Sequence, residues 1–127
     1  MKDVKQLQLG DWVNAEGKKT PVQITSLAND GSIEVNDDYY CTVEDLSSIW
    51  LLDGLMNKNF QKVHNEWRVD DRLRIIINPV EGKNWLLIMR TEECGYPLQF
   101  VPVCAFNFVH ELQHVLRMFG IDKEVVL

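Results

Sequence analysis

The chain has 127 residues, of which 46% are apolar and 25% are charged, as in an ordinary globular domain. This length is enough to bury a core, so we expect a single domain over residues 1–127. No apolar run approaches the roughly 18 residues that cross a bilayer, and the first residues lack the apolar core of a signal peptide. We therefore expect a cytoplasmic protein that does not contact membranes.

The formal net charge of −6 disfavours non-specific binding to nucleic acid, which needs Lys and Arg to neutralise phosphates. The nearest approach to a basic patch runs from Lys58 to Arg74. Glu66, Asp70 and Asp71 interrupt this patch, so we interpret it as a solvated surface of mixed charge.

The first 49 residues read as short strands separated by turn signals. Val22 and Ile24 are apolar at a period of two, and residues 32–35 alternate cleanly after the turn signal of residues 29–31. Several short strands at this spacing predict a small antiparallel, barrel-like region over residues 1–49.

Residues 50–127 read as a helix, several strands and a closing helix. Apolar side chains on one side predict a helix over residues 50–59, which Asn59 is expected to end in the left-handed conformation. Residues 79–83 are expected to form a hairpin loop, and residues 123–127 a final edge strand. Apolar runs predict strands at residues 63–69, 72–78, 85–90 and 98–103. This order predicts an α+β fold in which the barrel-like region is followed by an antiparallel sheet packed by a C-terminal helix.

The last predicted helix, residues 107–119, is the longest amphipathic segment of the chain. At about 100° per residue its apolar side chains form one stripe, and His110, His114 and Arg117 point to the opposite, solvated side. Gly120 is placed to end the helix in a Schellman motif. The apolar stripe consists of Val109, Leu112, Leu116 and Phe119, with Phe108 and Val115 at its edge.

The same helix contains His110-Glu111-Leu112-Gln113-His114, a match to the H-E-x-x-H pattern of zinc hydrolases. Residues i and i+4 share a helix face, so His110 and His114 could bind one zinc ion with Glu111 as general base. A catalytic site needs a third protein ligand, and no candidate stands at a compelling spacing. The upstream candidates are His64, Glu92, Glu93 and Cys94. We therefore expect neither a metal nor any other cofactor, and keep zinc as the alternative.

Two other residue types could carry function. The four tryptophans are expected in the core, although one or two could line a binding groove. The three cysteines are widely spaced and form no C-x-x-C pair, so reduced and mostly buried thiols are expected. The tryptophans are Trp12, Trp50, Trp67 and Trp85, and the cysteines are Cys41, Cys94 and Cys104.

Three stretches of the chain resemble a family of small uncharacterised proteins of Bacteroides-type bacteria. Residues 7–13 look like its opening "L-x-I-G-N-x-V", and residues 49–60 are similar to its helix "I-x-L-T-E-E-x-L-x-K-x-G-F". Residues 108–113, followed by Gly120 and Glu124, look like its close "Y-V-H-x-L-Q-N…G-x-E-L". The resemblance implies a phage-like or mobile-element context and no activity. His114 stands where asparagine is usual, which weakens the zinc interpretation.

The sequence thus favours a non-enzymatic accessory or interaction protein with an unknown protein partner. Its expected contact surfaces are any exposed tryptophans and the face formed by His110, His114 and Arg117. A zinc-dependent hydrolase is the alternative. Nucleic-acid binding through the barrel-like region and the Lys58 to Arg74 patch is a weaker alternative. The pattern of residues does not predict the oligomeric state.

Overall fold

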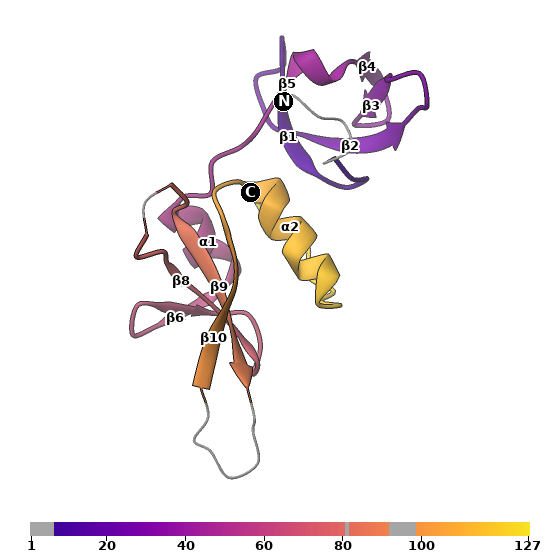
Figure 1. The fold of residues 1–127 in the computed structure, drawn as a ribbon. Coiled ribbons are helices and arrows are strands. Elements are labelled where there is room, and N and C mark those ends of the chain that lie inside the picture. Colours follow the sequence, from indigo (N-terminus) through magenta and orange to yellow (C-terminus); the bar gives the residue numbers. More distant parts are fainter. Residues whose placement is uncertain (1–6, 81, 92–98) are drawn as a thin grey trace. The chain divides into compact units, whose positions relative to one another are not determined.

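The computed structural model describes residues 7–80, 82–91 and 99–127, and its chain forms two compact units (Figure 1). The N-terminal unit contains Met1–Trp50 and Phe108–Glu124, and the C-terminal unit contains Leu51–Asn107 and Val125–Leu127. Each unit has a five-stranded antiparallel sheet and a helix, which confirms the α+β class. In the parts that the structure describes, no helix has both the length and the apolarity to cross a membrane.

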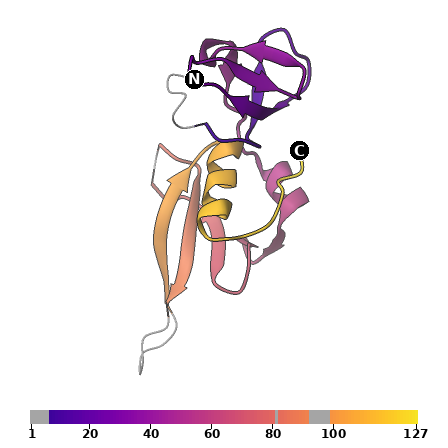
Figure 2. The ribbon, with the colours of Figure 1, turned by 90° about the vertical axis from the view of Figure 1, so that its right-hand side faces the viewer.

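The sheet of the N-terminal unit is curled into a half-barrel (Figure 2), as the sequence predicts. Its strand order is β4-β3-β2-β1-β5, so the last strand returns to pair with the first. The elements are β1 (Trp12–Ala15), β2 (Val22–Leu27), β3 (Ile33–Val35), β4 (Tyr39–Cys41), the 3₁₀ helix η2 (Val43–Asp45) and β5 (Leu46–Ser47). The small core of this unit consists of Leu7, Val13, Ala15, Val22, Ile24, Ile33, Val35, Cys41 and Leu46.

The N-terminal unit also contains the closing helix α2 (Val109–Met118), whose contacts group it with β1. The sequence pattern predicts this helix in the second region of the chain, residues 50–127, whereas its contacts group it with the first. Gly120 ends the helix as predicted: it has a φ of 69°. The N–H of Ile121 donates to the carbonyl of Leu116, and the N–H of Gly120 to that of Arg117, which together form a Schellman motif.

The sheet of the C-terminal unit has the order β10-β9-β8-β7-β6. Because it is a simple antiparallel meander, short loops suffice to connect its strands. Its elements are α1 (Asp53–Asn59), β6 (Gln61–Val63), β7 (Glu66–Arg68), β8 (Leu73–Ile77), β9 (Trp85–Thr91) and β10 (Gln99–Phe106).

The strand predicted over residues 63–69 is instead a hairpin of β6 and β7. His64 and Asn65 form its two-residue turn, with φ values of 51° and 65°. Two successive left-handed residues are typical of the type I′ turn that joins twisted strands. The prediction missed this turn because neither position is glycine.

Asn59 also differs from expectation. It is the last residue of α1 and does not adopt a positive φ; its side chain instead binds the end of the chain. Its Nδ2 donates to the carbonyl of Val126 at 2.8 Å, and its Oδ1 accepts the N–H of Val126 at 2.7 Å. Residues 123–127 therefore form no strand, contrary to the prediction, and the pair of amide bonds holds their last part.

One face of the C-terminal sheet forms the core of its unit. Trp67 and Trp85 lie there edge to face, with ring centroids 5.1 Å apart. The indole N–H of Trp67 donates to Oδ1 of Asn57, which fixes α1 on this face. Ile75 on β8 is fully buried, whereas the next residue, Ile76, points to the other face and is half-buried.

Replacing Ile75 with Ala should lower the free energy of unfolding by roughly 2–5 kcal/mol, because it leaves a cavity in a packed core. Ile76→Ala is the matched control and should cost clearly less. Urea denaturation followed by circular dichroism measures both. Equal losses would contradict the assignment of the two faces.

Candidate interaction site

Glu111, the acid of the H-E-x-x-H motif, caps its own helix. The backbone N–H of Phe108, which precedes the first helical residue, donates to Oε1 of Glu111 at 3.1 Å. A glutamate at the third helical position commonly satisfies this free N–H, and its charge suits the positive end of the helix dipole.

Gln113 joins α2 to the residues that lead into β1. Its Oε1 accepts the N–H of Trp12 at 2.9 Å, and its Nε2 donates to the carbonyl of Gly10, also at 2.9 Å. The side chain is buried, and its amide gives each of these backbone groups a hydrogen-bond partner; the carbonyl of Gly10 also accepts Nε2 of Gln23 at 2.9 Å.

Asp11 is fully buried beside the same helix, and its carboxylate is shared by three donors. Its Oδ2 accepts the N–H of Gln8 at 2.8 Å and His114 Nε2 at 2.7 Å. Its Oδ1 accepts Nη1 of Arg117 at 2.9 Å. A buried carboxylate is costly unless it is paired and hydrogen-bonded, and these contacts meet that condition.

Gly10 allows the segment before β1 to lie close to Arg117 of α2. It has a φ of 85°, and a Cβ at this position would lie 3.1 Å from Nη2 of Arg117. Since Arg117 is held by both Asp11 and the Oε1 of Gln8, it has little freedom to move away. Glycine therefore supplies both the backbone conformation and the space.

His110 lies beside this network and has a different environment. Its ring stacks on Phe108 and lies 5.6 Å from the ring of His114, measured between centroids. Its Nδ1 is buried and has no hydrogen-bond partner among the described residues. Burial lowers the pKa of His110, and His114 lowers it further, although the carboxylates of Asp11 and Glu111 act in the opposite direction.

The structure thus revises the expected solvated face of α2. His110 is buried, His114 is partly buried, and only Arg117 of the three is exposed. In the described ranges no three His, Cys, Asp or Glu side chains are grouped so that they could hold a metal ion. Glu92, Glu93 and Cys94, the upstream candidates for a third ligand, lie outside the described residues, and His64 is exposed in its turn.

Of the described thiols, Cys41 is not suited to act as a nucleophile. Cys41 is buried in the N-terminal core, and burial raises the pKa of its thiol, as does the charge of Asp45. A raised pKa keeps the thiol protonated and weakly nucleophilic at neutral pH. Cys104 lies on β10 and is partly buried.

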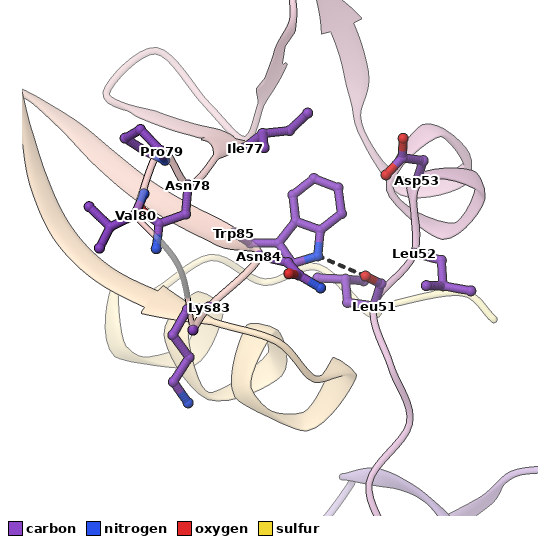
Figure 3. A pocket seen from close by; sticks show the side chains of 11 residues that line it. Leu51, Leu52, Asp53, Ile77, Asn78, Pro79, Val80, Lys83, Asn84 and Trp85 are labelled. Carbon is purple, nitrogen blue, oxygen red and sulfur yellow. Dashed lines mark hydrogen bonds between the residues drawn. The ribbon is translucent and has the colours of Figure 1, made fainter.

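The C-terminal unit has an open pocket of about 450 Å³ at the start of α1 and the loop between β8 and β9. Figure 3 shows the indole of Trp85 between Pro79 and Val80 on one side and Leu52 and Asp53 on the other. The indole N–H donates to the carbonyl of Leu51 at 2.7 Å, so the base of the pocket is fixed.

Three exposed apolar side chains line this pocket together with the polar residues Asp53, Asn78, Lys83 and Asn84. Leu52, Ile77 and Val80 keep 64%, 59% and 68% of their surfaces accessible. Asn107 holds the loop behind them: its Oδ1 accepts the N–H of Asn84, and its Nδ2 donates to the carbonyl of Gly82. The pocket could accept an apolar side chain of a partner.

The tryptophans divide between core and surface. Trp67 and Trp85 are buried and Trp12 is partly buried, whereas Trp50 is 55% exposed. The ring of Trp50 packs against Phe108 with 4.7 Å between centroids, and the two residues form an isolated β-bridge. Trp50 is therefore the one tryptophan available as a contact residue.

Sequence reasoning missed Asp11, because nothing local marks a carboxylate before a strand as the partner of a distant helix. A usable signal was the spacing of Gln113, His114 and Arg117. These polar residues lie on adjacent turns beside an apolar stripe, where a second, polar contact can form. The pocket also escaped prediction, since its walls come from segments about 25 residues apart.

Comparison of the chain with family models, curated proteins and solved structures found no match.

The two histidines of the motif should respond differently to replacement by Phe. His114→Phe removes a donor from the buried Asp11 carboxylate and should lower the free energy of unfolding by roughly 1–3 kcal/mol. His110→Phe keeps the ring against Phe108 and removes an unpartnered buried nitrogen, so the free energy should stay level or rise. Chemical denaturation measures both, and equal losses would contradict these separate roles.

Proposed function

We propose that this protein is a non-enzymatic interaction protein, an accessory component of a phage-like or mobile element. The observation that carries the proposal is the exposed apolar rim of the pocket in the C-terminal unit. Three large apolar side chains, Leu52, Ile77 and Val80, are each more than half exposed around a fixed indole. Large apolar side chains exposed around one pocket are typical of a binding site for another protein.

The environment of the H-E-x-x-H motif supports a non-catalytic role. Glu111 caps the helix, Gln113 binds the backbone of residues 10 and 12, and His114 binds Asp11. A catalytic zinc site would need the imidazole of His114 to leave Asp11. The resemblance of three stretches to a mobile-element family supports the proposed context.

The face formed by His110, His114 and Arg117 remains a proposed second contact surface. The exposed part of α2 consists of Arg117 and the following Met118, which is 66% exposed. His110 would contribute only through the shape of the helix surface, because it is buried.

A tagged chain should recover a specific protein from a lysate of its native host, and Val80→Glu should abolish this recovery by placing a charge on the pocket rim. Tyr40→Glu is the matched control: Tyr40 is a similarly exposed large side chain of the other unit, lies outside both proposed contact surfaces, and should retain the partner. Mass spectrometry compares the three samples. Loss of the partner in the control alone, or no specific partner at all, would contradict the proposal.

The zinc alternative is tested by elemental analysis of protein purified without added metal. We expect zinc well below one ion per chain, with no difference between the wild type and His114→Ala. Stoichiometric zinc that disappears in His114→Ala would overturn the non-enzymatic proposal. Glu111→Gln, which leaves both imidazoles intact, serves as the control for metal retention.

A further inference from the structure

The second face of the C-terminal sheet carries arginines in register. Arg68 on β7 lies directly opposite Arg74 on β8, and Arg74 lies opposite Ile88 on β9. Arg90, further along β9, lies opposite Phe100 on β10. Directly opposite residues of antiparallel strands project to the same face. We call this surface the arginine face, and define it by Arg68, Arg74, Ile88, Leu86, Arg90 and Phe100.

The arginine face remains partly open to solvent within its unit. Trp67, Ile75 and Leu87, which project to the other face, have no exposed surface. In contrast, Arg68 is exposed, Phe100 is 41% exposed, and Leu86 is only half-buried. Ile88 is buried. It lies opposite Arg74 on β8 and opposite Pro102 on β10.

One positive charge on this face, that of Arg68, is not balanced by a described residue. Arg68 forms no ion pair with any described residue, although it lies next to the like charge of Arg74. Like charges directly opposite one another destabilise a sheet. Arg74, in contrast, is partnered: its Nε is 4.0 Å from Oε2 of Glu66, and its Nη1 donates to the carbonyl of Asp70.

The positive charge is local and is not a property of the chain. The C-terminal unit contains seven Lys or Arg and seven Asp or Glu, so its formal charge is zero. The whole net charge of −6 therefore belongs to the N-terminal unit. The unit is balanced overall, and the exposed Arg68, unpaired among the described residues, makes its part of the arginine face locally positive and suited to a negatively charged partner.

The apolar side chains between the arginines favour a protein over a nucleic acid as the partner of this face. Guanidinium groups bind carboxylates through paired hydrogen bonds, and Leu86, Ile88 and Phe100 supply apolar contact beside them. Recognition of single-stranded nucleic acid depends on several aromatic rings on which bases stack. Among its described residues this face offers one aromatic ring, Phe100, which already lies 5.4 Å from the guanidinium of Arg74.

We infer that the arginine face is a docking surface for a protein segment in which carboxylates alternate with large apolar side chains. The inference rests on the proposed role as an interaction protein and adds the chemistry of one partner surface. It does not involve the pocket, because Leu52 and Val80 are not part of this face.

Fluorescence anisotropy with three labelled probes tests the inference on the full chain. The first is a short peptide in which Glu and Leu alternate, the second replaces each Leu with Ser, and the third is single-stranded oligo(dT). We expect the Glu-Leu peptide to bind about tenfold more tightly than the Glu-Ser peptide at about 0.15 M salt, since only it meets both the arginines and the apolar groups.

Arg68→Gln should weaken binding of the Glu-Leu peptide about three- to fivefold, and Phe100→Ala should weaken it without changing the preference for acidic probes. Arg68 is exposed and unpaired among the described residues, so its variant should remain folded. Lys62→Gln is the matched control, because the ammonium of Lys62 lies 4.8 Å from the Trp67 ring on the opposite face. Binding in this control should be unchanged.

Several results would overturn the inference. The first is that the Glu-Leu peptide does not bind. The second is that oligo(dT) binds more tightly than the Glu-Leu peptide and that this binding depends on Arg68. The third is that the chain self-associates in sedimentation experiments and that Arg68→Gln prevents it. If the peptide fails while the host partner is still recovered through the pocket, this inference alone is wrong. If the wild-type chain recovers no specific protein from the lysate while it still binds the Glu-Leu peptide, the proposed role of the pocket is wrong instead.

Discussion

The carboxylate of Asp11 is buried without any exposed surface and accepts hydrogen bonds from Gln8, His114 and Arg117. A buried charge is tolerated only where its partners are complete, so this one group fixes both the segment before β1 and the rotation of α2 about its axis. The bonds of Gln113 to Gly10 and Trp12 extend the same contact along the helix. The polar side of α2 is therefore as much an interior surface as its apolar side.

This arrangement accounts for the H-E-x-x-H pattern by structural contacts of its residues. The H-E-x-x-H pattern places two imidazoles on one helix face, because residues i and i+4 are neighbours there. A helix that binds a buried carboxylate also needs its polar side chains on one face. Glutamate at the third helical position is favoured by capping alone. Each polar residue of the motif except His110 thus has a structural partner, and His110 has the environment of a packed aromatic ring.

Much of the fold could be predicted from local patterns, because alternation and turn residues report on neighbours in sequence. The barrel-like region, the hairpin loop before β9 and the Gly120 stop are examples. Periodicity failed on the polar side of α2, since a polar side chain does not reveal whether water or a distant carboxylate will be its partner. It also could not place Arg90 and Phe100 beside Arg74, because that depends on strand register. Residues 123–127 do not form the predicted strand, because the side-chain amide of Asn59 binds the backbone N–H and carbonyl of Val126.

The discontinuity of the N-terminal unit has a consequence for folding during synthesis. The strands up to β5 emerge from the ribosome first, but His114 and Arg117, which complete the shell of Asp11, follow about a hundred residues later. Until then the half-barrel contains a carboxylate that lacks two of its three donors. The C-terminal sheet lies between these partners in sequence and can form in the interval, so the closing of α2 onto residues 8–12 is a late, long-range step that completes the N-terminal unit.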